Sequence, residues 1–245
     1  MNEVITQLYE RKSVRSFTEQ EIDEEIVQEI LTAATMAPTA GNQQLYTILR
    51  ITDENLKQSL SESCDHQPFV AKGKLLLVFC ADCLKWYDAF RYAGCEPRKP
   101  GEGDLLLAVN DALIAAQNAV VAAQSYGIGS CYIGDIMENV ETHREVLNLP
   151  EYVFPAALLV FGYPTKQQES RKKPERAELE FIVHENTYRQ MTESQLRQLF
   201  RKKCTEETYD SWMKAFCDRK YNSDFSKEMT RSVRKYLEQY GETKA

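Results

Sequence analysis

Hydrophobic and polar positions alternate along this chain with two different periods, which predicts a protein that mixes helices with strands. Apolar residues spaced three and four positions apart are typical of amphipathic helices. This spacing predicts helices over residues 2–10, 23–36, about 54–63 and 105–126. Short runs rich in Val, Ile, Leu and Phe predict strands over 46–52, 74–81, 130–134 and 153–162. The run at 74–81 is continuously apolar, so we expect that strand to be buried on both faces.

The helix predicted over 105–126 is very apolar and carries only a narrow polar stripe. The members of this stripe are Asn110, Asp111, Gln117, Asn118 and Gln124. A helix of this kind is buried on most sides, and its many Ala residues allow another helix to approach closely. We therefore expect a central helix that lies at an interface between subunits.

The turn predicted over 38–44 joins a helix to a strand. Pro38 ends the helix because proline disfavours helical geometry in the residue before it. Gly41 and Asn42 then permit backbone angles that most residues avoid. The turn either simply connects a helix to a strand or forms a wall against which a flat ligand can lie.

Other segments are predicted from their Gly and Pro residues, their helix-capping residues and their charge. The Gly and Pro residues of 88–103 predict a loop or lid. Thr142 and Glu145 have the spacing of a capping box, which predicts that a short helix begins there. Charge alone favours a solvated loop over 166–178. Residues 190–245 have a helical pattern but too few apolar residues for a core of their own, so we expect a C-terminal extension of one domain, 1–245, that wraps a partner subunit.

Composition narrows the function classes. The 245 residues carry a net charge of -7, with 13 Lys and Arg against 9 Asp and Glu in residues 189–245 and 17 against 28 before them. An acidic body argues against nucleic-acid binding but leaves room for a local anion site. The first 25 residues lack the apolar core of a signal peptide, and no uninterrupted apolar run is long enough for a membrane span. We expect a cytoplasmic protein without a membrane partner.

Cysteine and histidine give little support for a metal site. The seven Cys residues are expected to be reduced thiols. Cys80 and Cys83 form a C-x-x-C pair, but a zinc ribbon needs a second pair and none follows. The three His residues are scattered.

The sequence Arg11-Lys12-Ser13-Val14-Arg15 places three cations and a hydroxyl within five residues. Such a cluster is often only a solvated charged face. It also suits a phosphate, because arginine presents two parallel donors and serine adds a short hydrogen bond.

Seven motifs follow one another in a fixed order along the chain. They are R-K-S-V-R at 11–15, A-P-T-A-G-N-x-Q at 37–44, H-Q-x-x-V-A at 66–71, Y-I-G at 132–134, F-G-Y-P at 161–164, K-P-x-R at 173–176 and V-H-E-N-x-Y at 183–188. In this order the chain resembles the FMN-dependent nitroreductase family, closest to its NADPH-dependent flavin reductase and oxygen-insensitive nitroreductase branch. The resemblance covers roughly residues 5–190. It implies an α+β, nitroreductase-like fold, with a central mixed sheet flanked by helices, in an intertwined homodimer.

The resemblance also implies an FMN site at the dimer interface. Arg11, Ser13 and Lys12 would hold the phosphate, and Arg15 would reach the N1/O2 edge of the ring. Lys173 or Arg176 would close the other side of the phosphate. The family pattern is often K-P-R, so the additional Glu175 leaves open which of these two cations takes part.

The remaining ligands implied by the resemblance lie around the flavin ring. Gln67 would bind the pyrimidine edge, or it could simply face solvent. The partner subunit would supply Thr39, Ala40, Asn42 and Gln44. The ring would be lined by Tyr132, Ile133, Gly134 and Asp135, with a backbone N–H near the last two directed at N5.

The activity implied is reduction of nitroaromatics, quinones or free flavins by NADPH or NADH, in a ping-pong hydride transfer through FMN N5. The sequence offers no candidate for a catalytic residue, which suits an enzyme whose cofactor performs the chemistry. Alternatives are another reaction on the same fold, such as dehalogenation or ene reduction, or a non-enzymatic flavin-binding protein. Basic residues of the tail could bind the 2′-phosphate of NADPH or complement the acidic body. They are Arg201, Lys202, Lys203, Arg219 and Lys220.

Overall fold

A computed structural model describes residues 1–241 of the chain. These residues form two compact units. The first comprises 1–171 together with 228–241, and the second comprises 172–227. The described part of the extension predicted over 190–245 therefore has residues in both units. Whether a C-terminal extension embraces a partner subunit stays a prediction.

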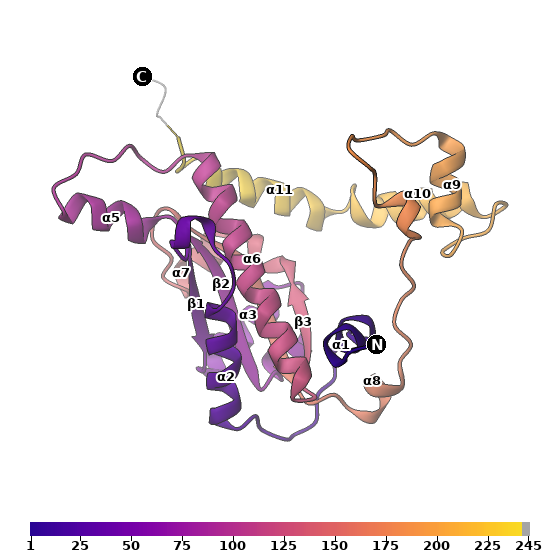
Figure 1. The fold of residues 1–245 in the computed structure, drawn as a ribbon, viewed down its shortest axis with the longest axis horizontal. Helices are drawn as coiled ribbons and strands as arrows, with labels where there is room; N and C mark the ends of the chain where they lie inside the picture. The colour runs from indigo at the N-terminus through magenta and orange to yellow at the C-terminus, as the bar shows by residue number, and fades with distance from the viewer. Residues whose placement is uncertain (242–245) are drawn as a thin grey trace. The chain divides into compact units, whose positions relative to one another are not determined.

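The first unit is built on a four-stranded sheet in the order β1-β2-β4-β3 (Figure 1). The strands are β1 (Tyr46–Ile51), β2 (Leu75–Asp82), β3 (Gly129–Ile133) and β4 (Val153–Gly162). All three pairings are antiparallel, so the prediction of a mixed sheet is wrong. A continuous apolar run indicates burial on both faces but carries no information on strand direction. Among the described residues, a parallel pairing remains only as an isolated bridge between Ser13 and Ser130.

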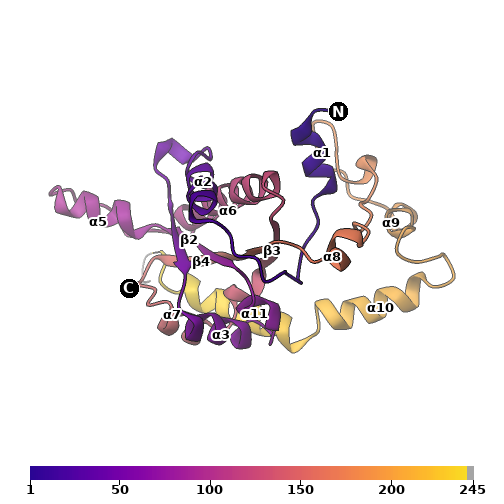
Figure 2. The same ribbon diagram turned by 90° about the horizontal axis from the view of Figure 1, so that it is seen from below.

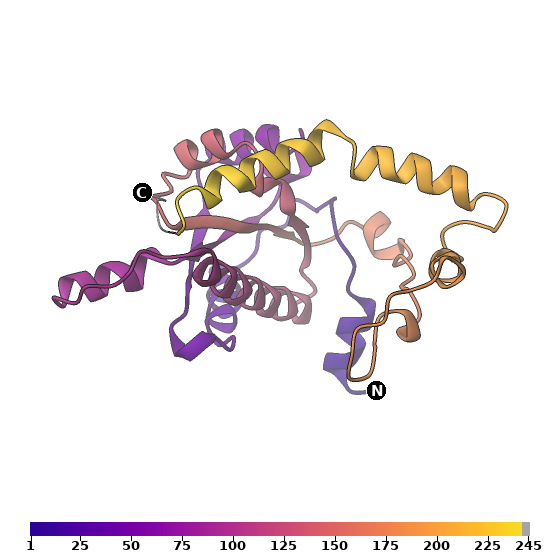
Figure 3. The same cartoon turned by 90° about the horizontal axis from the view of Figure 1, so that it is seen from above.

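Helices cover both faces of this sheet (Figures 2 and 3). On one face lie α2 (Glu24–Thr35) and α6 (Glu102–Ser125), and on the other lie α3 (Glu54–Ser63), α7 (Val140–Val146) and the end of α11 (Asp224–Leu237). Alternate residues of β2 enter two different cores, with Leu77 and Phe79 in one and Leu76 and Val78 in the other. Because β2 contributes side chains to both cores, it links the two layers. Full burial of each such side chain stabilises the fold by about 1.5–3 kcal/mol.

The central helix α6 is the structural counterpart of the apolar segment predicted at 105–126. Its buried residues are Leu105, Ala108, Asp111, Ala112, Ala115, Ala116, Ala119, Val120 and Ala123. The small Ala side chains let α2 and the sheet pack closely against it. Among helices of residues 1–241, α6 alone is long and apolar enough to cross a membrane, by length and composition. Its place in the core, which also buries Asp111, explains part of this apolar character. Four of its apolar residues stay exposed: Leu106, Leu107, Leu113 and Ile114.

Shorter elements connect these layers. They are α1 (Glu3–Glu10), η1 (Ala40–Asn42), α4 (Pro68–Ala71), α5 (Leu84–Tyr92), η2 (Gly134–Met137) and α8 (Lys166–Ser170). Helices therefore occupy the first residues of both predicted loops: α5 extends into 88–103, and α8 begins 166–178. The capping box predicted at Thr142 is wrong, because α7 already begins at Val140. The preceding Asn139 has a φ of 46°, and the N–H of Val140 is bound by the Ser232 hydroxyl at 3.1 Å.

The second unit contains η3 (Leu179–Phe181), α9 (Glu193–Phe200), α10 (Tyr209–Lys220) and the first residues of α11. Trp212 stacks on Phe216 with ring centroids 4.9 Å apart, and Phe200 lies 6.1 Å from the same indole. Neither α9 nor α10 has a buried residue. The C-terminal part of α11 belongs to the first unit, where Tyr236 is buried edge-on against Phe154.

Candidate functional site

The cationic cluster lies where the chain leaves α1 and pairs with β3. The N–H of Val14 donates to the carbonyl of Ser130 at 3.0 Å, beside the bridge between Ser13 and Ser130. This close approach requires Gly129, since a Cβ there would meet the Val14 side chain at 2.5 Å. Gly129 therefore allows the cluster to lie directly against β3.

Arg11, Ser13 and Arg15 converge on β3 at Cys131. Burial raises the pKa of the Cys131 thiol, and the neighbouring Arg15, the Ser13 hydroxyl and Arg11 act in the opposite direction. The Arg11 guanidinium also lies over the Tyr132 ring at 5.9 Å. The structure thus brings together three of the four residues of the 11–15 cluster that were predicted to bind the cofactor.

Arg11 is the member of this group with unsatisfied donors. Its Nε and one terminal nitrogen, Nη2, are buried and have no hydrogen-bond partner within residues 1–241. A buried donor without an acceptor costs about 1–3 kcal/mol, and more when it is charged. An anionic or acceptor-rich ligand at this position would remove that cost, so the arrangement fits a phosphate-bearing cofactor.

Lys12 is engaged elsewhere in the same unit. Its ammonium donates to the carbonyls of Glu169 and Arg171, both at 2.6 Å, at the C-terminal end of α8. The Gln168 side chain of the same helix accepts from the N–H of Arg15 at 3.1 Å. Lys12 thus ties α8 to the cluster, and its own contact with a phosphate stays a prediction that this arrangement does not favour.

The predicted turn at 38–44 is held by a residue whose role the sequence did not reveal. Asp111 of α6 accepts hydrogen bonds from the Thr39 hydroxyl, the N–H of Ala40 at 3.0 Å and the N–H of Leu45 at 3.2 Å. Its side chain is 3% exposed. The only available signal was its place in the polar stripe of an otherwise apolar helix.

The backbone of this turn has the unusual geometry that the sequence predicted. Gly41, Asn42 and Gln44 have φ values of 58°, 56° and 50°. The Thr39 hydroxyl also accepts from the N–H of Gln44 at 2.8 Å, and the Gln44 amide donates to the Thr35 carbonyl at 3.2 Å. These hydrogen bonds hold the turn against α2 and α6.

Gln67 and Asp135 meet at the other end of β3. The Gln67 amide nitrogen donates to the Cys64 carbonyl at 2.8 Å and to Asp135 Oδ2 at 3.3 Å. Gln67 is therefore fixed by its neighbours and does not simply face solvent. Ile133 is buried, and Gly134 and Asp135 open η2 directly after it. Burial raises the pKa of the adjacent Tyr132 to about 12, against the opposing charge of Arg11.

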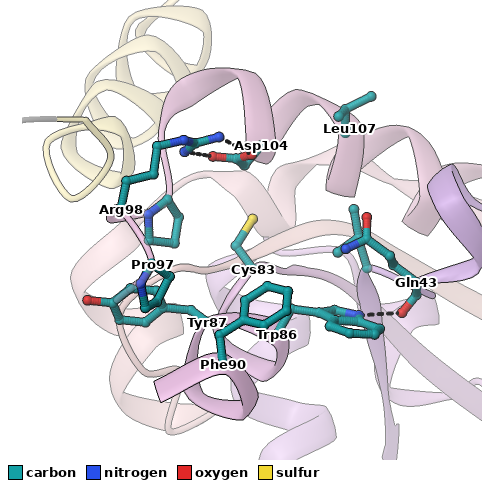
Figure 4. Close-up of a pocket in the computed structure, with 11 residues that line it drawn as sticks. Gln43, Cys83, Trp86, Tyr87, Phe90, Pro97, Arg98, Asp104 and Leu107 are labelled. Carbon is teal, nitrogen blue, oxygen red and sulfur yellow. Dashed lines mark hydrogen bonds and ion pairs between the residues drawn. The ribbon is translucent and has the colours of Figure 1, made fainter. Parts of the chain in front are cut away.

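A cavity of about 310 Å³ opens between the turn and α5 (Figure 4). Trp86, Tyr87 and Phe90 form its aromatic wall, and Cys83 lies at its centre. The indole N–H of Trp86 donates to the Gln43 carbonyl at 2.8 Å, which joins α5 to the turn. An ion pair between Arg98 and Asp104, 2.5 Å apart, borders the opening. The aromatic content of 84–92 was the one signal in the sequence that pointed to this wall.

Lys173 and Arg176 lie in the second unit. The carbonyl of Arg176 accepts from Lys202 Nζ at 3.4 Å, and Glu178 pairs with Arg201 and with Lys202. The assignment of either residue to the phosphate stays a prediction, as does the supply of the 38–44 turn by a partner subunit.

The cysteines show no arrangement suited to redox or metal chemistry. All seven are free, and burial, as the main cause, raises the pKa values of Cys80 and Cys83 to about 12. Both are therefore protonated at neutral pH, whereas a metal ligand or nucleophile is a thiolate. Within residues 1–241, no group of three or more His, Cys, Asp or Glu residues could hold a metal ion.

Comparison with known proteins gives consistent matches. The family model described as Nitroreductase family matches residues 8–163. FMN reductase (NAD(P)H) of Bacillus subtilis is 31% identical over 240 residues, which are 97% of this chain and 92% of that protein. FMN reductase (NADPH) of the same bacterium is 31% identical over 236 residues, or 96% and 87% of the two chains. The solved structure of the NfrA1 nitroreductase of B. subtilis has a TM-score of 0.80 at 28% identity, covering 96% of this chain and 98% of that one.

Proposed function

Since the chain belongs to the nitroreductase family, we propose that it is an FMN-dependent oxidoreductase that takes reducing equivalents from NADPH or NADH. The observation that carries the proposal is the convergence of Arg11, Ser13 and Arg15 on β3, with buried guanidinium donors on Arg11 that lack a partner among the residues that the structure describes. The names of the two curated relatives, both FMN reductases, support the same activity.

The residues fit FMN in three places. Arg11 and Ser13 would hold the phosphate, and Arg15 would stabilise the negative charge that develops at the N1/O2 edge on reduction. Gln67, held in place by Asp135, would bind the pyrimidine edge. When bound, FMN supplies a ring that accepts hydride from a nicotinamide and passes the electrons on. The protein supplies binding, orientation and exclusion of water.

The cofactor site is proposed to lie between two subunits of a homodimer. The 38–44 turn is anchored at Asp111, while Arg11 lies beside Val120. Nine residues of α6 separate these points, which is about 13 Å at 1.5 Å per residue. A turn supplied by the partner would cover the ring without spanning this distance. The exposed apolar residues of α6 also need a partner surface, and obligate dimers bury over about 2,000 Å². They are Leu106, Leu107, Leu113 and Ile114.

The cavity beside the turn supports a planar aromatic electron acceptor. Trp86 and Phe90 are only partly covered, at 37% and 40% exposure, with ring centroids 5.5 Å apart. Such a wall favours flat rings through offset or edge-to-face contacts. Nitroaromatics, quinones and free flavins share this chemistry. Nicotinamide and acceptor would use the cofactor in turn, in a ping-pong scheme.

The absorbance spectrum of the purified protein tests the cofactor. We expect the visible bands of a flavin, lost on anaerobic addition of NADPH and restored by a quinone or a nitroaromatic. A colourless protein that FMN does not colour would overturn the proposal. A flavoprotein that oxidises neither nicotinamide would be a non-enzymatic flavin binder, and one that turns over only halogenated or ene substrates would catalyse a different reaction on this fold.

We also propose the cellular location and the binding partners of the enzyme. The acidic first 188 residues argue against nucleic-acid binding. The core and the proposed subunit interface together account for the apolar residues of α6. We expect a cytoplasmic enzyme whose partners are a nicotinamide, a small-molecule acceptor and a second copy of itself.

A further inference from the structure

Glu138 is a buried acid with an unsatisfied oxygen. It follows η2 directly and is 6% exposed. Its Oε1 is fully buried and has no hydrogen-bond partner within residues 1–241. Burying an ionised carboxylate without a partner is so costly that such a group ordinarily takes up a proton.

The surroundings of Glu138 disfavour its charge. Carboxylates face it from three elements: Asp135 in η2, Asp65 in the turn after α3, and Glu228 in α11. Arg231 of α11 is already paired with two other carboxylates, Glu228 at 2.8 Å and Glu141 at 2.7 Å.

The neutral groups packed nearby offer no compensating charge. His143 of α7 is buried and has both ring nitrogens in use, with the Ile136 carbonyl at 2.9 Å and the Ser63 hydroxyl at 2.8 Å. Burial lowers the pKa of His143. Burial and the charges of Asp135 and Glu138 raise the pKa of the Cys64 thiol. At neutral pH both groups are therefore uncharged.

Glu138 also lies in the turn between β3 and α7, and this turn contacts α11. Its N–H donates to the Asp135 carbonyl at 3.0 Å, and Asp135 in turn holds Gln67. The next residue, Asn139, donates its N–H to Glu228 at 3.2 Å and its side-chain amide to the Ser63 carbonyl at 2.9 Å. Hydrogen bonds thus link Glu138 to Asp135 and, through Asp135, to Gln67.

We propose that Glu138 is a positioning residue: its protonated form holds the turn over 134–139 in the geometry that binds the cofactor, and its ionised form loosens that turn. The effect on the cofactor rests on the proposed function. The effect on folding does not, because it requires only the buried acid and its neighbours.

The stability of the folded protein should fall as the pH rises. Burial first, and then the charges of Asp135, Asp65 and Glu228, raise the pKa of Glu138 from its ordinary 4.5 to about 7. The folded protein keeps a proton that the unfolded chain releases, so stability falls as the pH rises between these two values. Above pH 7 the folded protein itself loses the proton, and its affinity for FMN should decrease.

The first experiment compares the FMN dissociation constant of native protein, Glu138→Gln and Glu141→Gln at pH 6, 7 and 8. FMN changes charge in this range, because its phosphate has a second pKa near about 6. The ratio between each variant and native protein is therefore the quantity of interest. Linkage to one proton allows about a tenfold loss of native affinity per pH unit at most.

We expect Glu138→Gln to lack this loss, so that its advantage over native protein grows to about tenfold at pH 8. The matched control Glu141→Gln should follow native protein, because its pKa is held at about 2 by Arg231. A ratio between Glu138→Gln and native protein that is the same at all three pH values would overturn the proposal.

A second variant keeps Glu138 and moves its midpoint. Asp65→Asn removes one neighbouring charge, and Asn tolerates the φ of 60° at this position. The thermal stability of the FMN-free protein should fall over a lower pH range in this variant than in native protein. If the pH range over which stability falls is the same in Asp65→Asn and in native protein, Glu138 does not act through its ionisation and the proposal is wrong. If FMN binds at no pH while the midpoint moves, the proposed function fails and the role of Glu138 in folding stands.

Discussion

Replacing Asp111 by Ala should release the 38–44 turn from α6. The carboxylate is buried and accepts from the Thr39 hydroxyl and from the N–H groups of Ala40 and Leu45. A hydrogen bond to a charged group contributes about 1.5–3 kcal/mol. Three such bonds are not additive, because the partly exposed turn can rehydrate its donors and the buried charge is removed as well. We expect a net loss of about 3 kcal/mol, within the range for breaking a buried charged contact.

This loss is measurable by thermal unfolding. For a chain of this size it corresponds to a decrease in Tm of roughly 6–12 °C. Hydrogen exchange of the peptide covering 38–45 should accelerate, because the amides of Ala40 and Leu45 lose their acceptor. FMN affinity should fall with it if the turn covers the ring.

Two neighbours on α6 serve as matched controls. Asn118→Ala removes one neutral hydrogen bond, from its amide to the Ala33 carbonyl at 3.1 Å, and should cost about 1 kcal/mol. Asn110→Ala changes a side chain on the exposed face of α6 and should leave the amides of 38–45 as protected as in native protein. If Asp111→Ala unfolds like Asn110→Ala, with residues 38–45 still protected, the anchoring role is refuted.

Three further changes test the binding sites. Arg11→Ala or Arg15→Ala should each weaken FMN binding about ten- to a hundredfold through loss of a charge-assisted contact, and full flavin content after dialysis would contradict this. Trp86→Ala should lower kcat/KM for aromatic acceptors about tenfold and leave that for NADPH unchanged, while Tyr92→Ala on the same helix, 89% exposed, should change neither. Neutralising the basic tail residues should reduce a preference for NADPH over NADH by about ten- to a hundredfold, and a preference that persists would exclude them. These residues are Arg201, Lys202, Lys203, Arg219 and Lys220.

Local patterns predicted the elements of the fold well. The strand expected at 74–81 is Leu75–Asp82, and the helix expected at 105–126 is Glu102–Ser125, because burial imposes a period that the sequence records. The turn at 38–44 was also predictable, since Gly41 and Asn42 are residues that accept a positive φ.

What escaped prediction depends on residues that are distant in sequence. Asp111 reads as one polar position in a stripe, and only packing directs it to a turn 66 to 72 residues earlier. Lys12 reads as a free cation, yet it binds carbonyls more than 150 residues away. Glu138 reads as an ordinary surface acid until three elements enclose it. Strand direction and these long-range partners are properties of the assembled fold and have no local signature.

The distribution of aromatic side chains gives each compact unit its own optical reporter. The chain has two tryptophans, Trp86 in the first unit and Trp212 in the second. Trp86 is bound to the Gln43 carbonyl, whereas Trp212 is stacked on Phe216. Their emission spectra and lifetimes should therefore differ. With Trp86→Phe and Trp212→Phe as single-tryptophan proteins, denaturation followed by fluorescence would show whether the two units melt together or in sequence.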